Sequence, residues 1–185
     1  MKLKIVKFKR VKSTNDEAIK LIRSDMYLLG LVSTDSQTKG RGTMGKKWIS
    51  HKGNIFISIF FKVNLIKIKI ENHLIINANI IKKILSKYTK KIIKIKKPND
   101  LLVDGKKICG ILQEVIDHKK EKYLITGIGI NTKIATSNKY TSLKKNSNKS
   151  INNKIIIDKI KINYDKLIYD INNHNSSYVK KKYIN

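Results

Sequence analysis

The stretch LLVDGKKICGILQEVIDHKKEKYLITGIGI, residues 101–130, decides the fold class. Apolar residues 101–103 precede Asp104-Gly105, a dipeptide typical of a tight hairpin turn, and residues 107–116 form the returning strand. A second turn at residues 117–122 leads into a third strand at residues 123–130. Because strands joined by short turns pair antiparallel, this stretch predicts a largely antiparallel sheet.

The flanking segments add strands and helices to this sheet. Alternating apolar and polar residues predict a strand at residues 2–11, and apolar runs predict strands at 28–33, 54–62 and 92–96, with Pro98 ending the last. Helical spacing of apolar residues predicts helices at 14–23, 71–88 and 160–171, and Thr14 with Glu17 fits a capping box on the first. The sequence therefore predicts an α+β fold, a mostly antiparallel mixed sheet flanked by helices.

The length of 185 residues suits a single domain. Residues 131–153 are polar and of low complexity, which predicts a loop before the last helix. The polar residues 173–185 predict a tail that frays, so we expect one catalytic domain over residues 1–172.

The charge of the chain raises one candidate function. Lysine and arginine number 41 against 13 acidic residues, a net charge of +28, which would attract the phosphates of a nucleic acid. The excess is nearly all lysine, with arginine only at Arg10, Arg23 and Arg41, and the arginine clusters and aromatic platforms that read bases are missing. A basic nucleic-acid-binding protein is therefore an alternative, and we expect no specific nucleic-acid partner.

Cysteine and histidine usage limits the chemistry. The single cysteine, Cys109, excludes an internal disulfide and a thiolate zinc cluster and suits a reducing cytoplasm. The four histidines are scattered without metal-ligand spacing, so we expect no protein-bound metal. Apolar runs are too short to cross a bilayer. We expect a cytoplasmic protein without membrane association, and a homodimer stays open.

Three segments carry residues that packing alone does not explain. Residues 40–48, GRGTMGKKW, place three glycines among cations, a pattern suited to wrapping phosphates but also typical of a mobile loop. Lys47 stands where a P-loop requires Ser or Thr, which excludes that motif. Residues 96–102, KKPNDLL, predict a turn, and the alternating glycines of 127–132, GIGINT, open one strand face to a ligand or to a packing neighbour.

Together and in this order, these segments resemble the biotin protein ligase family. The catalytic domain of that family carries a Ser-Thr-Asn helix start, a Gly-Arg-Gly-x-x-Gly-x-x-Trp loop, a Lys-Trp-Pro-Asn-Asp turn, a Lys-x-x-Gly-Ile-Leu strand and a Gly-x-Gly-x-Asn strand. The matching residues are 13–15, 40–48, 96–100, 107–112 and 127–131. The resemblance implies the fold of the family and ATP-dependent activation of biotin to biotinyl-5'-AMP, with Mg²⁺ bound to ATP. It also implies transfer of biotin to a lysine of the biotin carboxyl carrier protein, an acetyl-CoA carboxylase subunit.

The resemblance further implies roles for individual residues. Lys96 and Arg41 are the expected catalytic cations, which would offset the negative charge where the biotin carboxylate attacks the α-phosphate. The expected biotin-binding residues are Ser13, Thr14, Gln37, Gly40, Arg41, Gly110, Ile111, Gly127 and Gly129. The expected ATP- and adenylate-binding residues are Gly42, Thr43, Gly45, Trp48, Lys96, Asn99 and Asn131.

The sequence also departs from the family pattern. Thr43 and Met44 stand where the family often carries arginine, and Lys97 replaces the tryptophan of the Lys-Trp-Pro-Asn-Asp turn. We expect neither an N-terminal winged helix nor a C-terminal β-barrel domain, and hence no repressor activity. A lipoate or octanoate ligase of the same fold is the alternative enzyme, although its Arg-Arg-x-x-Gly-Gly-Gly loop is absent from this sequence.

Overall fold

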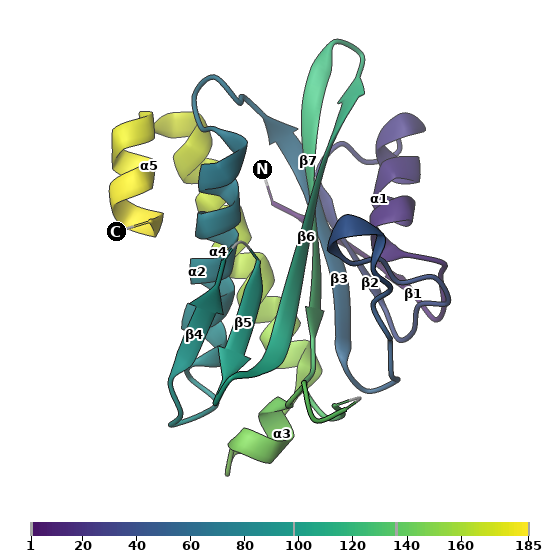
Figure 1. Ribbon diagram of the computed structural model, residues 1–185. Helices are drawn as coiled ribbons and strands as arrows, with labels where there is room; N and C mark the ends of the chain where they lie inside the picture. The colour runs from purple at the N-terminus through teal and green to yellow at the C-terminus, as the bar shows by residue number, and fades with distance from the viewer. Residues whose placement is uncertain (1, 98, 136, 185) are drawn as a thin grey trace.

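The computed structural model describes residues 2–97, 99–135 and 137–184. Within these residues, seven strands form one mixed sheet with helices on both faces (Figure 1), which confirms the predicted α+β fold. The strands are β1 (Lys4–Phe8), β2 (Gly30–Thr34), β3 (Ile55–Val63), β4 (Ile93–Lys96), β5 (Asp100–Val103), β6 (Lys106–His118) and β7 (Glu121–Ile130). The helices are α1 (Thr14–Arg23), α2 (Ile70–Leu85), α3 (Leu143–Asn146), α4 (Asn153–Asn173) and α5 (Ser176–Tyr183).

The sheet has the strand order β1-β2-β3-β7-β6-β5-β4. Among the described strand pairs, β1 and β2 run parallel and all others antiparallel. Both predicted hairpins are confirmed: Asp104 and Gly105 have φ of 49° and 74°, and Lys119 and Lys120 have φ of 48° and 64°. Positive φ at both central residues gives a two-residue turn the twist that flanking strands need.

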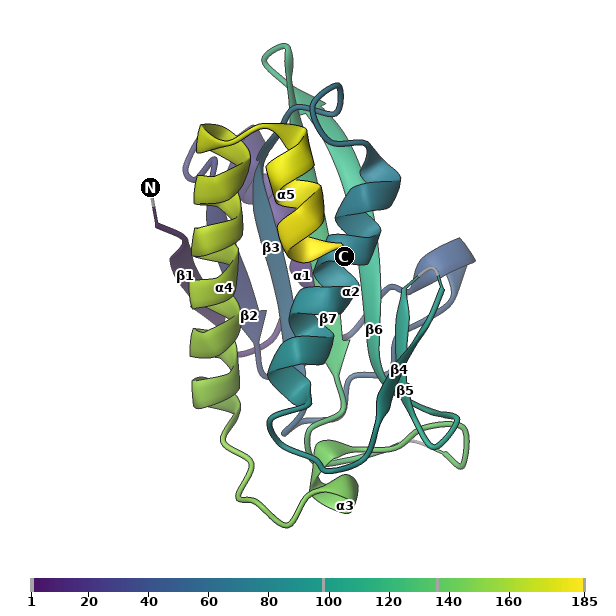
Figure 2. The ribbon, with the colours of Figure 1, turned by 90° about the vertical axis from the view of Figure 1, so that its left-hand side faces the viewer.

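Helices cover the two faces of the sheet unequally. On one face, α2, α4 and α5 lie across the strands (Figure 2) and close the larger core, which includes Ile59, Ile81 and Tyr164. On the other face, α1 packs through Ala18 and Ile22 against a smaller cluster of apolar side chains. Because α1 is only 10 residues long, part of this second face is left to the loops that form the site.

The polar C-terminal segments are more ordered than predicted. The prediction that residues 173–185 fray is wrong for the described part, because residues 176–183 form α5 and Val179 is fully buried. Asp170 of α4, itself only 3% exposed, accepts a 2.6 Å hydrogen bond from the Tyr183 hydroxyl and pairs with Lys182 at 2.7 Å. The predicted loop 131–153 also contains α3, and α4 begins earlier than expected, where Asn152 caps it.

Candidate active site

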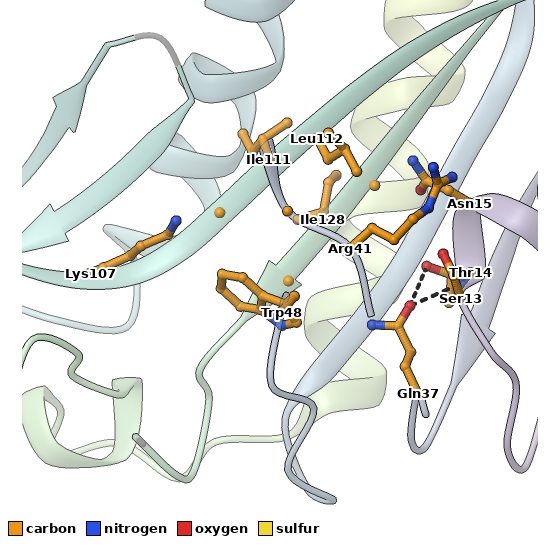
Figure 3. A pocket seen from close by; sticks show the side chains of 14 residues that line it. Ser13, Thr14, Asn15, Gln37, Arg41, Trp48, Lys107, Ile111, Leu112 and Ile128 are labelled. Carbon is orange, nitrogen blue, oxygen red and sulfur yellow. Dashed lines mark hydrogen bonds between the residues drawn. The ribbon is translucent and has the colours of Figure 1, made fainter. Parts of the chain in front are cut away.

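A pocket opens on the α1 side of the sheet, between α1, the glycine-rich loop and strands β6 and β7 (Figure 3). Three segments far apart in the sequence meet there: the start of α1, the loop that follows β2, and the adjacent glycines of β6 and β7. A cavity of about 40 Å³ remains between the side chains. The lining residues are Ser13, Thr14, Asn15, Gln37, Arg41, Gly42, Trp48, Lys107, Gly110, Ile111, Leu112, Gly127, Ile128 and Gly129.

The floor of the pocket is a pair of glycines beneath an indole ring. Gly110 and Gly129 are direct partners across β6 and β7. A Cβ atom on Gly129 would lie 2.4 Å from Cε2 of Trp48, and one on Gly110 would lie 2.7 Å from its Cζ3. Any side chain at either position would therefore push the ring off the sheet. Trp48 Nε1 is buried and has no hydrogen-bond partner among the described residues, which leaves a donor inside the pocket.

The start of α1 forms a polar wall. The helix begins at Thr14 with Ser13 as N-cap residue, so the predicted capping box, with Thr14 as the cap, is wrong. Thr14 serves the pocket instead: its backbone N–H and its hydroxyl donate to Gln37 Oε1 at 2.8 and 3.1 Å, and the hydroxyl lies 2.7 Å from the Ser58 hydroxyl. Gln37 in turn donates to the Ser50 hydroxyl at 3.0 Å. This network presets Thr14 and Gln37 for a polar ligand.

Arg41 of the glycine-rich loop is held by two carboxylates. Its Nη1 and Nη2 atoms donate to Glu114 Oε1 and Oε2 at 2.9 and 2.7 Å, and Nη2 also pairs with Asp16 Oδ1 at 2.9 Å. Asn15 Nδ2 donates to the same Glu114 carboxylate at 2.6 Å. The positive charge of Arg41 is thus already offset within the protein.

Lys107, which sequence reasoning did not single out, is the lysine that lines the pocket. Its Nζ lies 5.2 Å from the centre of the Trp48 ring and pairs with Asp100 at 2.6 Å. Lys96 is exposed at the end of β4 and is not part of the lining. The structure therefore places Lys107, and not Lys96, among the lining residues. The sequence did carry a signal for this residue, because Lys107 is the first residue of the Lys-x-x-Gly-Ile-Leu motif.

A β-bulge explains why regular strand alternation predicts the wrong face of the sheet for the Lys107 side chain. Leu101 of β5 pairs with Cys109, but Leu102 pairs with Lys107, so Ile108 is one extra residue on β6. Without the bulge, Lys107 and Gly110 would point to opposite faces. With it, Lys107 Cε lies 2.9 Å from where a Cβ of Gly110 would stand.

The remaining predicted residues fall into two groups. Ser13, Gly42, Ile111 and Gly127 line the pocket as expected. Gly40, predicted to bind biotin, lies outside the lining and is buried where a Cβ would meet the Trp48 carbonyl at 2.5 Å. Outside the lining lie four residues predicted to bind ATP or the adenylate: Thr43 and Gly45 in a 3₁₀ turn, and the buried Asn99 and Asn131. Asn99 Nδ2 donates to the Ile111 carbonyl at 2.6 Å and so braces β6, while Pro98 of the same predicted turn lies outside the described residues.

Asn15, Leu112 and Ile128 complete the lining and were not predicted individually. Asn15 belongs to the Ser-Thr-Asn motif, Leu112 ends the Lys-x-x-Gly-Ile-Leu motif, and Ile128 lies between the two glycines of the Gly-x-Gly-x-Asn motif. Gly127 is required by Asn15, because a Cβ there would lie 2.4 Å from Asn15 Oδ1.

The chemistry that the pocket offers is binding and charge stabilisation. Cys109, beside the glycine floor, is fully buried, and burial raises the pKa of its thiol, so it supplies no thiolate nucleophile. Among the described residues, no group of three or more His, Cys, Asp or Glu side chains could hold a metal ion. No described helix is long and apolar enough to cross a membrane.

Comparisons with known proteins identify the family of the chain. The sequence profile of the "Biotin/lipoate A/B protein ligase family" matches residues 7–131. The bifunctional ligase/repressor BirA of Bacillus spizizenii is 32% identical over 123 residues, which cover 65% of this chain and 38% of that protein. The chain thus spans well under half the length of this curated relative.

Solved structures extend the likeness to nearly the whole chain. A biotin protein ligase from Aquifex aeolicus in complex with biotin and ATP has a TM-score of 0.77 at 25% identity, covering 97% of this chain and 76% of that one. A biotin protein ligase from Leishmania major in complex with biotin has a TM-score of 0.74 at 25% identity, covering 88% and 73%. Since the family profile matches more than half of its residues, the chain belongs to the biotin/lipoate A/B protein ligase family.

Proposed function

We propose that the chain is an ATP-dependent biotin protein ligase, which converts biotin and MgATP to biotinyl-5'-AMP and transfers biotin to a carrier lysine. One observation carries the proposal: a polar wall, a glycine floor under an indole ring, and the cations Arg41 and Lys107 converge on one pocket. In this proposal the carrier is the biotin carboxyl carrier domain of acetyl-CoA carboxylase, and the reaction takes place in the cytoplasm.

The residues present suit this chemistry. The polar network of Thr14 and Gln37 supplies fixed donors and acceptors for a cyclic urea, and the apolar side chains of Ile111 and Ile128 supply contact area for the remaining ring. A carboxylate is already an anion at neutral pH, so its attack on phosphorus needs no general base. It needs positive charge near the α-phosphate, which Lys107 is placed to provide from the pocket wall.

The proposed reaction has two steps. A carboxylate oxygen of biotin forms a bond to the α-phosphorus, the bond from that phosphorus to the bridging oxygen breaks, and pyrophosphate leaves with Mg²⁺. The neutral amine of the carrier lysine then attacks the acyl carbon, AMP leaves, and the amine proton passes to solvent. A closed loop over the pocket would exclude the water that hydrolyses the mixed anhydride.

The test is modification of a carrier domain, measured by mass spectrometry. The folded protein, biotin and MgATP should add a single biotin to one lysine, and omission of ATP should abolish the adduct. Parallel reactions with lipoate and octanoate test the alternative ligase of the same fold. Lipoyl or octanoyl transfer without biotin transfer would overturn the choice of substrate. Salt-sensitive DNA retention without any acyl transfer would favour the nucleic-acid-binding alternative.

A further inference from the structure

The carboxylate of Glu114 contacts two parts of the pocket at once. Both of its oxygens accept from the Arg41 guanidinium, at 2.9 and 2.7 Å, in a bidentate arrangement. One of the two also accepts from Asn15 Nδ2 at 2.6 Å. A single side chain on β6 therefore contacts both the glycine-rich loop and the start of α1.

Arg41 is the point at which the loop is fastened. Within the described structure, the side-chain hydrogen bonds and ion pairs of residues 40–47 all come from Arg41. The backbone bonds of the loop, from Gly42 N to the Lys46 carbonyl at 2.7 Å and from Trp48 N to the Gly40 carbonyl at 2.9 Å, stay inside it. They shape the loop but do not attach it to the sheet.

Asn15 depends on the same carboxylate. Its Oδ1 accepts from the Ser58 hydroxyl, and this oxygen lies 2.4 Å from where a Cβ of Gly127 would stand. Asn15 is 2% exposed, so its amide nitrogen has no access to water as a substitute partner. Without Glu114, this buried donor would lose the hydrogen bond that fixes its orientation.

We propose that Glu114 is a positioning residue that fastens the glycine-rich loop over the pocket through Arg41 and fixes the pocket wall through Asn15. The proposal rests on the proposed function only in naming biotin as the ligand. Asp16, which pairs with Arg41 at 2.9 Å, is a second and weaker fastening, because it offers one contact where Glu114 offers two. Glu114 is not among the residues that line the pocket, whereas Arg41 and Asn15 are, so its effect on the ligand passes through these two.

The experiment uses Glu114→Gln, Arg41→Ala and the double variant, with Glu121→Gln as the matched control. Glu121 pairs with Lys62 at 2.6 Å near the β6–β7 turn, far along the hairpin from the pocket, so its neutralisation tests charge loss alone. Amide hydrogen exchange of residues 38–50 is measured without ligand. Biotin dissociation is followed by the fluorescence of Trp48, the only tryptophan of the chain.

Glu114→Gln keeps the side-chain shape but replaces a charge-assisted fork with one weaker acceptor. We expect loop exchange and biotin dissociation to accelerate about tenfold, KM for biotin to rise by a similar factor, and kcat to change less than about twofold. We expect the double variant to exchange no faster in the loop than Arg41→Ala, because Glu114 acts on the loop through Arg41. Glu121→Gln should match the wild type.

The proposal would be overturned by unchanged loop exchange in Glu114→Gln, or by an equal acceleration in Glu121→Gln. It would also be overturned if the loop of the double variant exchanged faster than that of Arg41→Ala, by the factor seen for Glu114→Gln alone. If Glu114→Gln does not fold, Arg41→Ala alone is measured, because it removes the same loop contact. A loop in Arg41→Ala that exchanges as slowly as in the wild type would overturn the fastening. Loop exchange needs no ligand. If the wild type does not bind biotin but the variants differ in loop exchange as expected, the proposed function is refuted and the role of Glu114 in fastening the loop is supported.

Discussion

Replacing Lys107 with methionine should abolish most of the activity, whereas the same change at Lys96 should leave it nearly intact. Methionine keeps the length of the side chain and removes its charge. Lys107 lines the pocket beside Trp48, while Lys96 is exposed at the end of β4. The two variants therefore compare a cation that lines the pocket with one of the many solvated lysines.

The magnitude follows from the placement of the charge. The Lys107 side chain is 24% exposed, so an effective dielectric constant of about 20 applies, and a unit charge at about 4 Å gains roughly 4 kcal/mol. Loss of one preorganised contact to a developing anion costs about 10²–10³ in kcat, which is roughly 2.7–4 kcal/mol. The loss of the Lys107–Asp100 pair should change stability by less than about 1 kcal/mol, since both partners reach solvent.

The assay is biotin-dependent release of pyrophosphate from ATP, with thermal unfolding as the control for folding. Lys107→Met should lose at least about 10² in rate at an unchanged melting temperature, and Lys96→Met should stay within about twofold of the wild type. If Lys96→Met lost its activity and Lys107→Met kept it, the role of Lys107 would be refuted. Lys96 would then be the catalytic cation, as expected from the sequence.

Three further changes test other parts of the structure. Gly129→Ala should push the Trp48 ring off the sheet, because the new Cβ would lie 2.4 Å from it, and the fluorescence should shift to longer wavelength; an unchanged spectrum would contradict the packing. Burial lowers the pKa of His73 from 6.5 to about 4, so its neutral form stabilises the fold above pH 6.5 and that contribution, about 3 kcal/mol, is lost as pH falls to 4. Between pH 7 and pH 4, the free energy of unfolding of His73→Leu, measured with denaturant, should fall by about 3 kcal/mol less than that of the wild type. An equal fall in both proteins would contradict the lowered pKa of His73. Thr43→Arg, which restores a cation common in the family, should slow release of labelled biotinyl-5'-AMP about tenfold, and equally slow release by the wild type would argue that Lys46 and Lys47 already suffice.

Local patterns were sufficient to predict most of the secondary structure. The Asp104-Gly105 turn and the apolar alternation around it depend only on neighbouring residues, so the hairpins of β5, β6 and β7 could be predicted. The capping box was mispredicted because Thr14 has a stronger tertiary use, its bonds to Gln37 and Ser58. Helix α5 was missed because only one of its described side chains, Val179, is fully buried, which leaves no apolar stripe in the sequence.

Most strands and the amphipathic helices could be predicted without the structure, because each depends on residues within a few positions of one another. Only the tertiary structure decided which charged groups meet. Arg41 and Glu114 are 73 positions apart and pair because the loop folds back over β6. Lys107 reaches the pocket because the bulge at Ile108 reverses the alternation of the strand before it. Contacts of this kind depend on strand register and loop path, which local residue patterns do not encode.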